Sequence, residues 1–266
     1  MLSCCSHHRL QRLWPVVSPA LKYSTQIQKI FGDAKHADFI AGAASAANFP
    51  ESHGLPEVIV TGRANVGKSS LFNAVLGRKS LLHTSKRAGH TRQLNFYRVG
   101  APPGKLILVD APGYGARGRP EWGEMFDKYL QTRKELRRVY ILFNGKHGLN
   151  EFDRQMLAHL SGLLDISRGA QPWTIQSVIT KADTIPSSEM RTAIASIRNQ
   201  IQEAAPMCLP PIITKYFRCL WNRPCKFIIN DWRTNRMNLY VMLIVSALPH
   251  LPFILQVTGV KFNCVR

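Results

Sequence analysis

The chain has 266 residues, of which 45% are hydrophobic, enough for one sizeable domain with a buried core and extensions at its ends. Its six cysteines show no C-x-x-C spacing and its histidines show no metal-ligand spacing, which excludes a zinc knuckle and argues against a disulfide framework. The net charge is +19, with 23 basic against 15 acidic residues in 33–206 and eight against one in 207–266. This excess favours a polyanionic partner, RNA before membrane, although much of the charge could equally belong to a removable leader and an unusual tail.

Residues 1–32 have the composition of a mitochondrial transit peptide. They contain several hydroxyl residues and four basic residues, and no acidic residue precedes Asp33. We expect a leader of this kind to be cut at Lys22–Thr25, and its proline-broken apolar stretch is too short to cross a bilayer. The alternative is an N-terminal arm without fixed structure. Residues 33–54 predict only a short helix or an irregular lead-in to the core.

The stretch from Glu57 to Leu76 predicts a buried strand, a glycine-rich loop and a helix. The loop sequence GRANVGKS fits G-x-x-x-x-G-K-[ST], whose glycines let the backbone approach a phosphate while loop and helix amides donate to it. Lys68 is expected to reach the β- and γ-phosphates, and Ser69 to give its hydroxyl to Mg²⁺. The loop residues expected to bind the nucleotide are Gly62, Arg63, Ala64, Asn65, Val66, Gly67, Lys68, Ser69 and Ser70. A chance match is the alternative, which the flanking strand and helix disfavour.

Residues 78–93 are polar, basic and turn-rich, so they predict a mobile loop. A nucleotide switch needs a hydroxyl here that closes on Mg²⁺ when a γ-phosphate is present and releases after hydrolysis. Thr91 is the candidate for this role, ahead of Thr84 and Ser85 when judged on distance along the chain.

Two strands are predicted next, at 94–99 and 105–109, and the second leads into the D-x-x-G sequence from Asp110 to Gly113. Asp110 follows the loop lysine by about 40 residues, a spacing at which we expect it to hold Mg²⁺ through water. Gly113 is then placed to turn its amide toward the γ-phosphate.

Residues 121–136 predict a helix whose stripe of large side chains, including Trp122, is interpreted as core rather than as an RNA-stacking surface. A buried strand at 139–143, an amphipathic helix at 149–164 and another strand at 174–179 follow. A helix is also predicted at 188–205.

The strand at 174–179 ends in Thr180-Lys181-Ala182-Asp183, which fits the [NT]-K-x-D turn that selects guanine. The Asp183 carboxylate would accept from guanine N1 and the 2-amino group, and the Lys181 stem would lie over the base. Adenine lacks that pair of donors and would leave the carboxylate unsatisfied. Alternating strands and helices predict an α/β fold with a mostly parallel sheet covered on both faces, and all three motifs fall at the carboxyl ends of strands, where ligands bind.

These residues resemble the EngB-type GTPases, within the P-loop class that also holds the Era and TrmE proteins. The stretches that carry the resemblance are GRANVGKSS (62–70), SKRAGHTRQLNFY (85–97), VDAPGYG (109–115) and TKAD (180–183). The resemblance covers roughly residues 55–206 and implies a three-layer P-loop GTPase fold. It implies that Lys68, Ser69, Thr91, Asp110 and Gly113 bind Mg²⁺ and the phosphates of GTP or GDP, with Lys68, Thr91 and Gly113 catalytic. Lys181 and Asp183 map onto the family's base-selecting pair.

Two positions bear on the rate of hydrolysis. Tyr114 stands where many GTPases have a glutamine that orients the attacking water, so we predict slow intrinsic hydrolysis or reliance on another group. Asn65 matches the loop asparagine that helps related potassium-activated GTPases hold K⁺ against the phosphates. A K⁺ at that place would supply the positive charge that an arginine finger gives elsewhere.

Residues 207–266 depart from the family pattern. Residues 209–214 (LPPIIT) predict the start of the last family strand, and a second apolar run at 239–245 leads into Ser246-Ala247, a candidate for the displaced turn that contacts the base. No convincing closing helix follows, which suggests an altered or misread terminus and predicts an uncovered apolar face of the sheet. A membrane span near 239–260 is disfavoured by its central prolines, so we expect no stable membrane insertion; RNA binding by the basic, aromatic part is a further alternative.

The sequence thus predicts a monomeric, Mg²⁺-dependent GTPase of the mitochondrial matrix that acts as a switch in assembly of the large ribosomal subunit. Its partners would be a guanine nucleotide and ribosomal RNA or a large-subunit precursor. The alternative is a nucleotide-binding scaffold for RNA or the ribosome that does not cycle.

Overall fold

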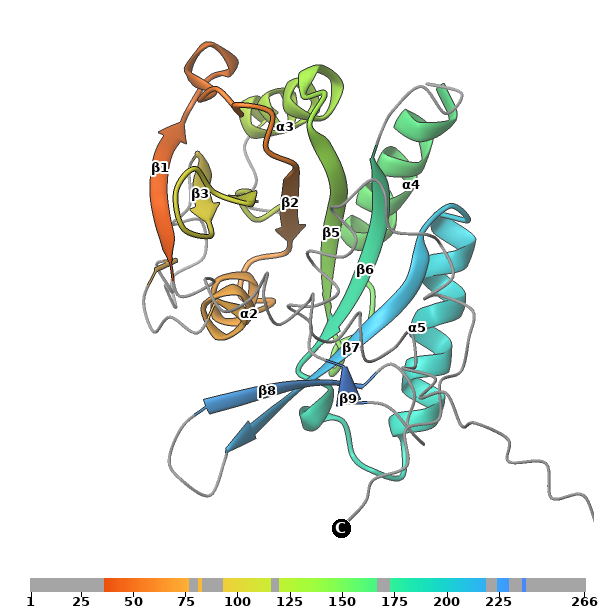
Figure 1. Ribbon diagram of the computed structural model, residues 1–266. Coiled ribbons are helices and arrows are strands. Elements are labelled where there is room, and N and C mark those ends of the chain that lie inside the picture. The colour runs from red at the N-terminus through yellow and green to blue at the C-terminus, as the bar shows by residue number, and fades with distance from the viewer. Residues whose placement is uncertain are drawn as a thin grey trace, which may run out of the picture.

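The computed structural model describes residues 36–76, 81–82, 93–115, 120–166, 173–218, 224–229 and 236–237. Within them, nine strands form one sheet in the order β1-β3-β4-β2-β5-β6-β7-β8-β9 (Figure 1). The pairings that join β4, β2, β5, β6 and β7 are parallel, whereas β3 and β8 run against their neighbours. The predicted mostly parallel α/β sheet is therefore confirmed.

The described strands are β1 (Ala37–Ala43), β2 (Glu57–Gly62), β3 (Leu94–Val99), β4 (Leu106–Asp110), β5 (Leu136–Asn144), β6 (Thr174–Thr180), β7 (Leu209–Arg218), β8 (Pro224–Ile229) and β9 (Arg236–Met237). The described helices are α2 (Lys68–Val75), α3 (Pro120–Thr132), α4 (Glu151–Ile166) and α5 (Met190–Ala204), with short 3₁₀ turns η1 (Ala46–Asn48) and η2 (Ala182–Thr184).

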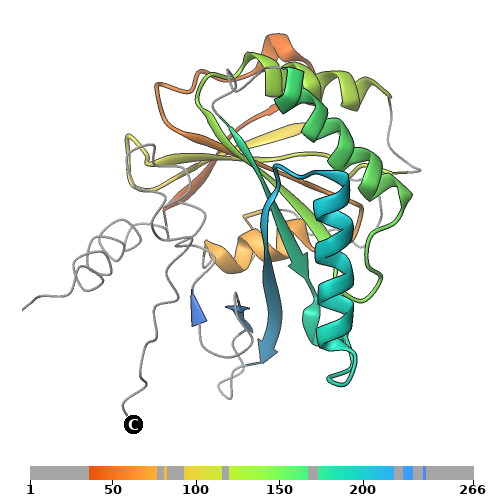
Figure 2. The same cartoon turned by 90° about the vertical axis from the view of Figure 1, so that its right-hand side faces the viewer.

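Helices cover both faces of the sheet, which confirms the predicted three layers. The first face packs against α3, α4 and α5, and the second face packs against α2 (Figures 1 and 2). Successive residues of β5 alternate between the two sides, with Ile141 in the first core and Leu142 in the second. This period of two lets one strand bury both of its faces, and it explains why the central strands are continuously apolar.

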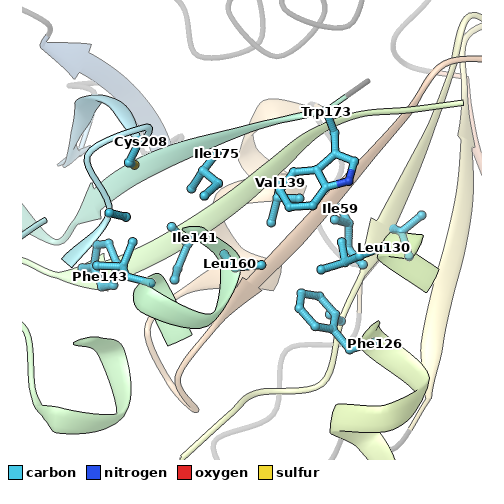
Figure 3. Packing of buried hydrophobic residues seen from close by; sticks show 14 of the residues in the cluster. Ile59, Phe126, Leu130, Val139, Ile141, Phe143, Leu160, Trp173, Ile175 and Cys208 are labelled. Carbon is cyan, nitrogen blue, oxygen red and sulfur yellow. The ribbon is translucent and has the colours of Figure 1, made fainter. Parts of the chain in front are cut away.

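The larger core lies between the sheet and α3, α4 and α5 (Figure 3). Val139, Ile141 and Phe143 of β5 face this layer together with Ile175 of β6. Full burial of such a side chain contributes about 1.5–3 kcal/mol to folding. In the apolar stripe of the helix predicted at 121–136, Met125, Phe126, Tyr129 and Leu130 are buried in this core as predicted, whereas Trp122 is only half-buried.

Two boundaries differ from the sequence prediction. The lead-in at 33–54, expected as a short helix or an irregular segment, contains β1, an edge strand antiparallel to β3. Its pattern is hard to recognise because only Ala37 and Ala43 of the strand are buried, so backbone pairing rather than side-chain burial defines it. The helix predicted to run to Leu136 ends at Thr132, because Leu136 begins β5 and pairs with Glu57.

The start of the tail differs from the family expectation. The strand predicted at 209–214 is confirmed, and it pairs in parallel with β6 before it continues into an antiparallel hairpin with β8. The prediction that one apolar face of the sheet is left uncovered is wrong for Tyr140, Val178 and Ile212, which are each 1% exposed. These residues lie on the face that packs against α2, and β8 also contacts α2. The leader at 1–32 and the candidate turn Ser246-Ala247 lie outside the described residues. Among the helices that the structure describes, none is both long and apolar enough to cross a bilayer.

Candidate nucleotide-binding site

Three segments meet at one edge of the sheet, where the parallel strands end. The glycine-rich loop follows β2, Asp110 is the last residue of β4, and Thr180 is the last residue of β6. In the sheet order, β4 and β5 flank β2, and β6 lies beside β5. The carboxyl ends of neighbouring parallel strands form the usual ligand crevice of such sheets.

The loop after β2 has the backbone that a phosphate site requires. Gly67 adopts φ 105°, a left-handed conformation that glycine takes at little cost, and it directly precedes α2. No side chain caps this helix, so its first amides remain available as donors. A Cβ on Gly62 would lie 3.0 Å from the Leu142 carbonyl oxygen, which shows how closely the loop begins against β5. The loop therefore presents amides and the positive end of α2 to an anion.

Lys68 and Asp110 form the charged centre of the site. The Lys68 ammonium donates to the Gly62 carbonyl at 3.1 Å, and burial lowers the pKa of this lysine, an effect that Asp110 partly opposes. Burial raises the pKa of Asp110 to about 6, with Lys68 acting in the other direction. One carboxylate oxygen of Asp110, Oδ1, is buried without a hydrogen-bond donor.

A buried carboxylate oxygen without a donor costs free energy that a cation would recover. Ser69 lies in the first turn of α2, which follows β2, the neighbour of β4, and it supplies a hydroxyl. In the described part of the chain there is no group of three or more His, Cys, Asp or Glu residues placed to hold a metal. One carboxylate and one hydroxyl suit Mg²⁺, which keeps several waters and shares phosphate oxygens, rather than a metal held in an all-protein cage.

The turn after β6 is joined directly to the glycine-rich loop. The Thr180 hydroxyl lies 2.7 Å from the Val66 carbonyl oxygen and 3.0 Å from the Phe143 carbonyl oxygen, and it donates to either. The Lys181 ammonium donates to the Asn65 carbonyl at 2.8 Å. Thr180 is 4% exposed. Its buried hydroxyl therefore links the turn that would hold the base to the glycine-rich loop that would hold the phosphates.

Gly113 lies against the glycine-rich loop. A Cβ on Gly113 would be 3.1 Å from the Ala64 amide nitrogen, so only glycine fits without a shift of backbone. The next residue, Tyr114, forms an isolated parallel bridge with Arg63 and donates its hydroxyl to Asp153 at 2.8 Å. Burial, together with the Asp153 carboxylate, raises the pKa of Tyr114 well above its usual value. The phenol is therefore neutral at physiological pH and is engaged with α4.

Most of the predicted residues come together at this edge: Gly62 to Ser70, Asp110, Gly113, Thr180 and Lys181. Asp183 is exposed on η2, beside them in the chain. Thr91, Ser246 and Ala247 lie outside the described residues. Sequence reasoning missed Asp153, although the spacing Asn150-x-x-Asp153 before an apolar helix is a capping signal that would have placed it at a helix start.

Comparison with known proteins adds the family. The family described as "50S ribosome-binding GTPase" matches residues 57–172. The chain is similar to "Probable GTP-binding protein EngB" of Roseobacter denitrificans, with 33% identity over 204 residues that cover 74% of this chain and 88% of that protein. It is also similar to the protein of that name in Bradyrhizobium diazoefficiens, with 41% identity over 175 residues that cover 63% and 74%. Among solved structures, Era from Aquifex aeolicus is 24% identical at a TM-score of 0.42, covering 60% of this chain and 51% of Era.

Proposed function

Because the chain belongs to the EngB family of P-loop GTPases, we propose that it is a Mg²⁺-dependent switch in assembly of the mitochondrial large ribosomal subunit. The observation that carries this proposal is the meeting of the phosphate loop, the unpaired Asp110 oxygen and the Lys181 turn at one sheet edge. The family description supports a ribosomal partner, and the excess of basic residues suits RNA. The composition of residues 1–32 supports the mitochondrial matrix.

Hydrolysis in this site would depend on positioning and charge rather than on covalent chemistry. Loop and helix amides and the Lys68 ammonium would bind the β- and γ-phosphates, and Lys68 would neutralise charge that develops on the transferred group. Ser69, Asp110 and Thr91 would hold Mg²⁺, which neutralises charge between the β- and γ-phosphates when bound. The Gly113 amide would face the γ-phosphate, and Asp183 would accept from the guanine base.

Asn65 motivates a second proposal for the same site, a K⁺ held beside the phosphates. The residue adopts a left-handed backbone with φ 61°, and its carbonyl already accepts from Lys181. The measurement is the GTP hydrolysis rate in K⁺ and in Na⁺ at equal ionic strength. Equal rates in the two salts would exclude a specific K⁺ role.

The ribosomal role is tested by sedimentation of the full chain with large-subunit particles isolated from mitochondria. Protein loaded with a non-hydrolysable GTP analogue should co-sediment with the particles, and protein loaded with GDP should not. Lys68→Ala, which removes the phosphate-binding ammonium, is the control that should abolish the difference. Co-sedimentation that ignores the nucleotide would favour the alternative, a scaffold that does not cycle, and would overturn the switch.

A further inference from the structure

Tyr114 is fixed at two points although it directly follows a residue expected to move with the nucleotide. Its backbone pairs with Arg63 of the phosphate loop, and its hydroxyl donates to Asp153 Oδ1 of α4 at 2.8 Å. The Arg63 Nε lies 3.4 Å from the other oxygen of the same carboxylate, Oδ2. One carboxylate thus joins the phosphate loop, the segment after Asp110 and the start of α4.

Asp153 is itself held in place. It is 1% exposed, its amide donates to the Asn150 side-chain oxygen at 3.0 Å, and its Oδ2 accepts from the Asn150 amide at 3.0 Å. This reciprocal cap satisfies two amides at the helix start, and the positive end of α4 favours the negative charge. These contacts hold the carboxylate in one position, so we call it the anchor.

Tyr114, which the Asp153 carboxylate holds, directly follows Gly113. Gly113 packs closely on the loop, since a Cβ on it would lie 3.1 Å from the Ala64 amide nitrogen. With the segment docked in this way, we expect the Gly113 amide to reach a γ-phosphate bound by the loop. GDP has no γ-phosphate, so its binding does not depend on that amide. Anything that keeps the segment docked will favour GTP over GDP.

We propose that the Arg63–Asp153–Tyr114 network is a positioning device that holds Gly113 against the phosphate loop and thereby sets the preference for GTP and the rate of its hydrolysis. Tyr114 then works through Gly113 and not by orienting water. The inference depends on GTP binding at this loop and is independent of the ribosomal partner.

The size of the effect follows from the bond that is lost. A buried hydrogen bond to a charged group is among the stronger hydrogen bonds in proteins. Without it, a smaller fraction of the protein has the segment docked and ready to bind GTP, and the apparent affinity falls by that fraction. Removal of the Tyr114 hydroxyl should weaken binding of a GTP analogue roughly 5- to 30-fold and reduce kcat by a similar factor. GDP affinity should change by less than about twofold, since GDP makes no contact with the segment.

The test is Tyr114→Phe in the full chain, titrated with fluorescent GDP and with a fluorescent non-hydrolysable GTP analogue in Mg²⁺. Tyr129→Phe is a matched control, because its hydroxyl also donates to a buried carboxylate, that of Glu57 at 2.5 Å, but at the opposite end of β2. The control should lower stability and leave the ratio of the two affinities unchanged. A Tyr114→Phe protein whose ratio equals that of the wild type would overturn the proposal.

A second variant keeps the test decisive if Tyr114→Phe folds poorly. Asp153→Asn preserves the shape of the cap and removes the charge that faces Arg63, so it should also shift the affinity ratio toward GDP. In the double variant the two effects should be less than additive, because both act on one network. Full additivity would count against a shared device. A wild-type protein that binds neither GTP nor GDP would remove the premise that this loop binds the nucleotide. That result is distinct from one in which the wild type prefers GTP and both variants prefer it to the same extent, which would overturn the network alone.

Discussion

The Asp110 carboxylate makes the unliganded protein less stable than it would be with a neutral side chain. Burial raises its pKa from 3.8 to about 6, so the folded state binds the proton more tightly than the unfolded state. The stability due to this proton is fully present below the unfolded pKa and is lost as the pH rises through about 6. A shift of about two pKa units corresponds to about 3 kcal/mol at pH 7 and to about half of that at pH 5.

Asn resembles the protonated carboxyl, so Asp110→Asn should stabilise the nucleotide-free protein at pH 7 by up to about 3 kcal/mol. The expected rise in melting temperature is roughly 6–12 °C, shrinking as the pH falls toward 4. The assay is thermal unfolding of the full chain in chelator, at pH 7 and pH 5. Glu124→Gln on the exposed side of α3 is the control and should change neither melting curve.

The same variant should lose the stabilisation that Mg²⁺ and GTP give to the wild type. The carboxylate is the only group in the proposed metal set that carries charge, and its loss removes the attraction to the cation. A variant that melts at or below the wild-type temperature at pH 7 in chelator would refute the burial argument. A variant that still gains stability from Mg²⁺ with GTP would refute the metal role.

Three further changes have defined outcomes. Lys68→Ala should abolish phosphate release from GTP, measured in a steady-state assay, and retained turnover would place catalysis elsewhere. Asp183→Asn should reduce the preference for GTP over ATP by at least about 100-fold in competition binding, because the base donors lose their charged acceptor. Glu57→Gln should cost about 1.5–3 kcal/mol in urea unfolding, because the half-buried Arg133 and the Tyr129 hydroxyl lose their shared carboxylate, and a loss below about 0.5 kcal/mol would show that this pair contributes little.

The central strands and motifs could be predicted because their signals are local. Val58 to Val60 are continuously apolar before a glycine-rich loop, and the same logic located β4 and β6 at the two other motifs. Edge strand β1 was not predicted because its side chains do not alternate regularly between buried and exposed. Its large apolar side chains, Phe39 and Ile40, are exposed, so they give no pattern typical of a core strand. Its strand conformation depends on the open edge of β3, which a local pattern cannot reveal.

The parts of the site that the sequence did not reveal depend on contacts between distant segments. Thr180 was predicted as part of a base-binding turn, but its hydroxyl lies against Val66, 114 positions away. Tyr114 was noted only because it stands where many GTPases have a glutamine. Its hydrogen-bond partner Asp153 is 39 positions further along the chain. A motif identifies the residue types that chemistry needs, whereas the side chains that hold a motif in place become visible only when the segments are brought together.

The most direct test is to measure GTP, GDP and ATP binding to the full chain by calorimetry, followed by phosphate release from GTP in Mg²⁺. We expect both guanine nucleotides to bind at micromolar concentration, ATP not to bind, and GTP to be hydrolysed slowly. ATP binding as tight as GTP binding would contradict the role of the Lys181–Asp183 turn. No binding of any nucleotide would contradict the central claim.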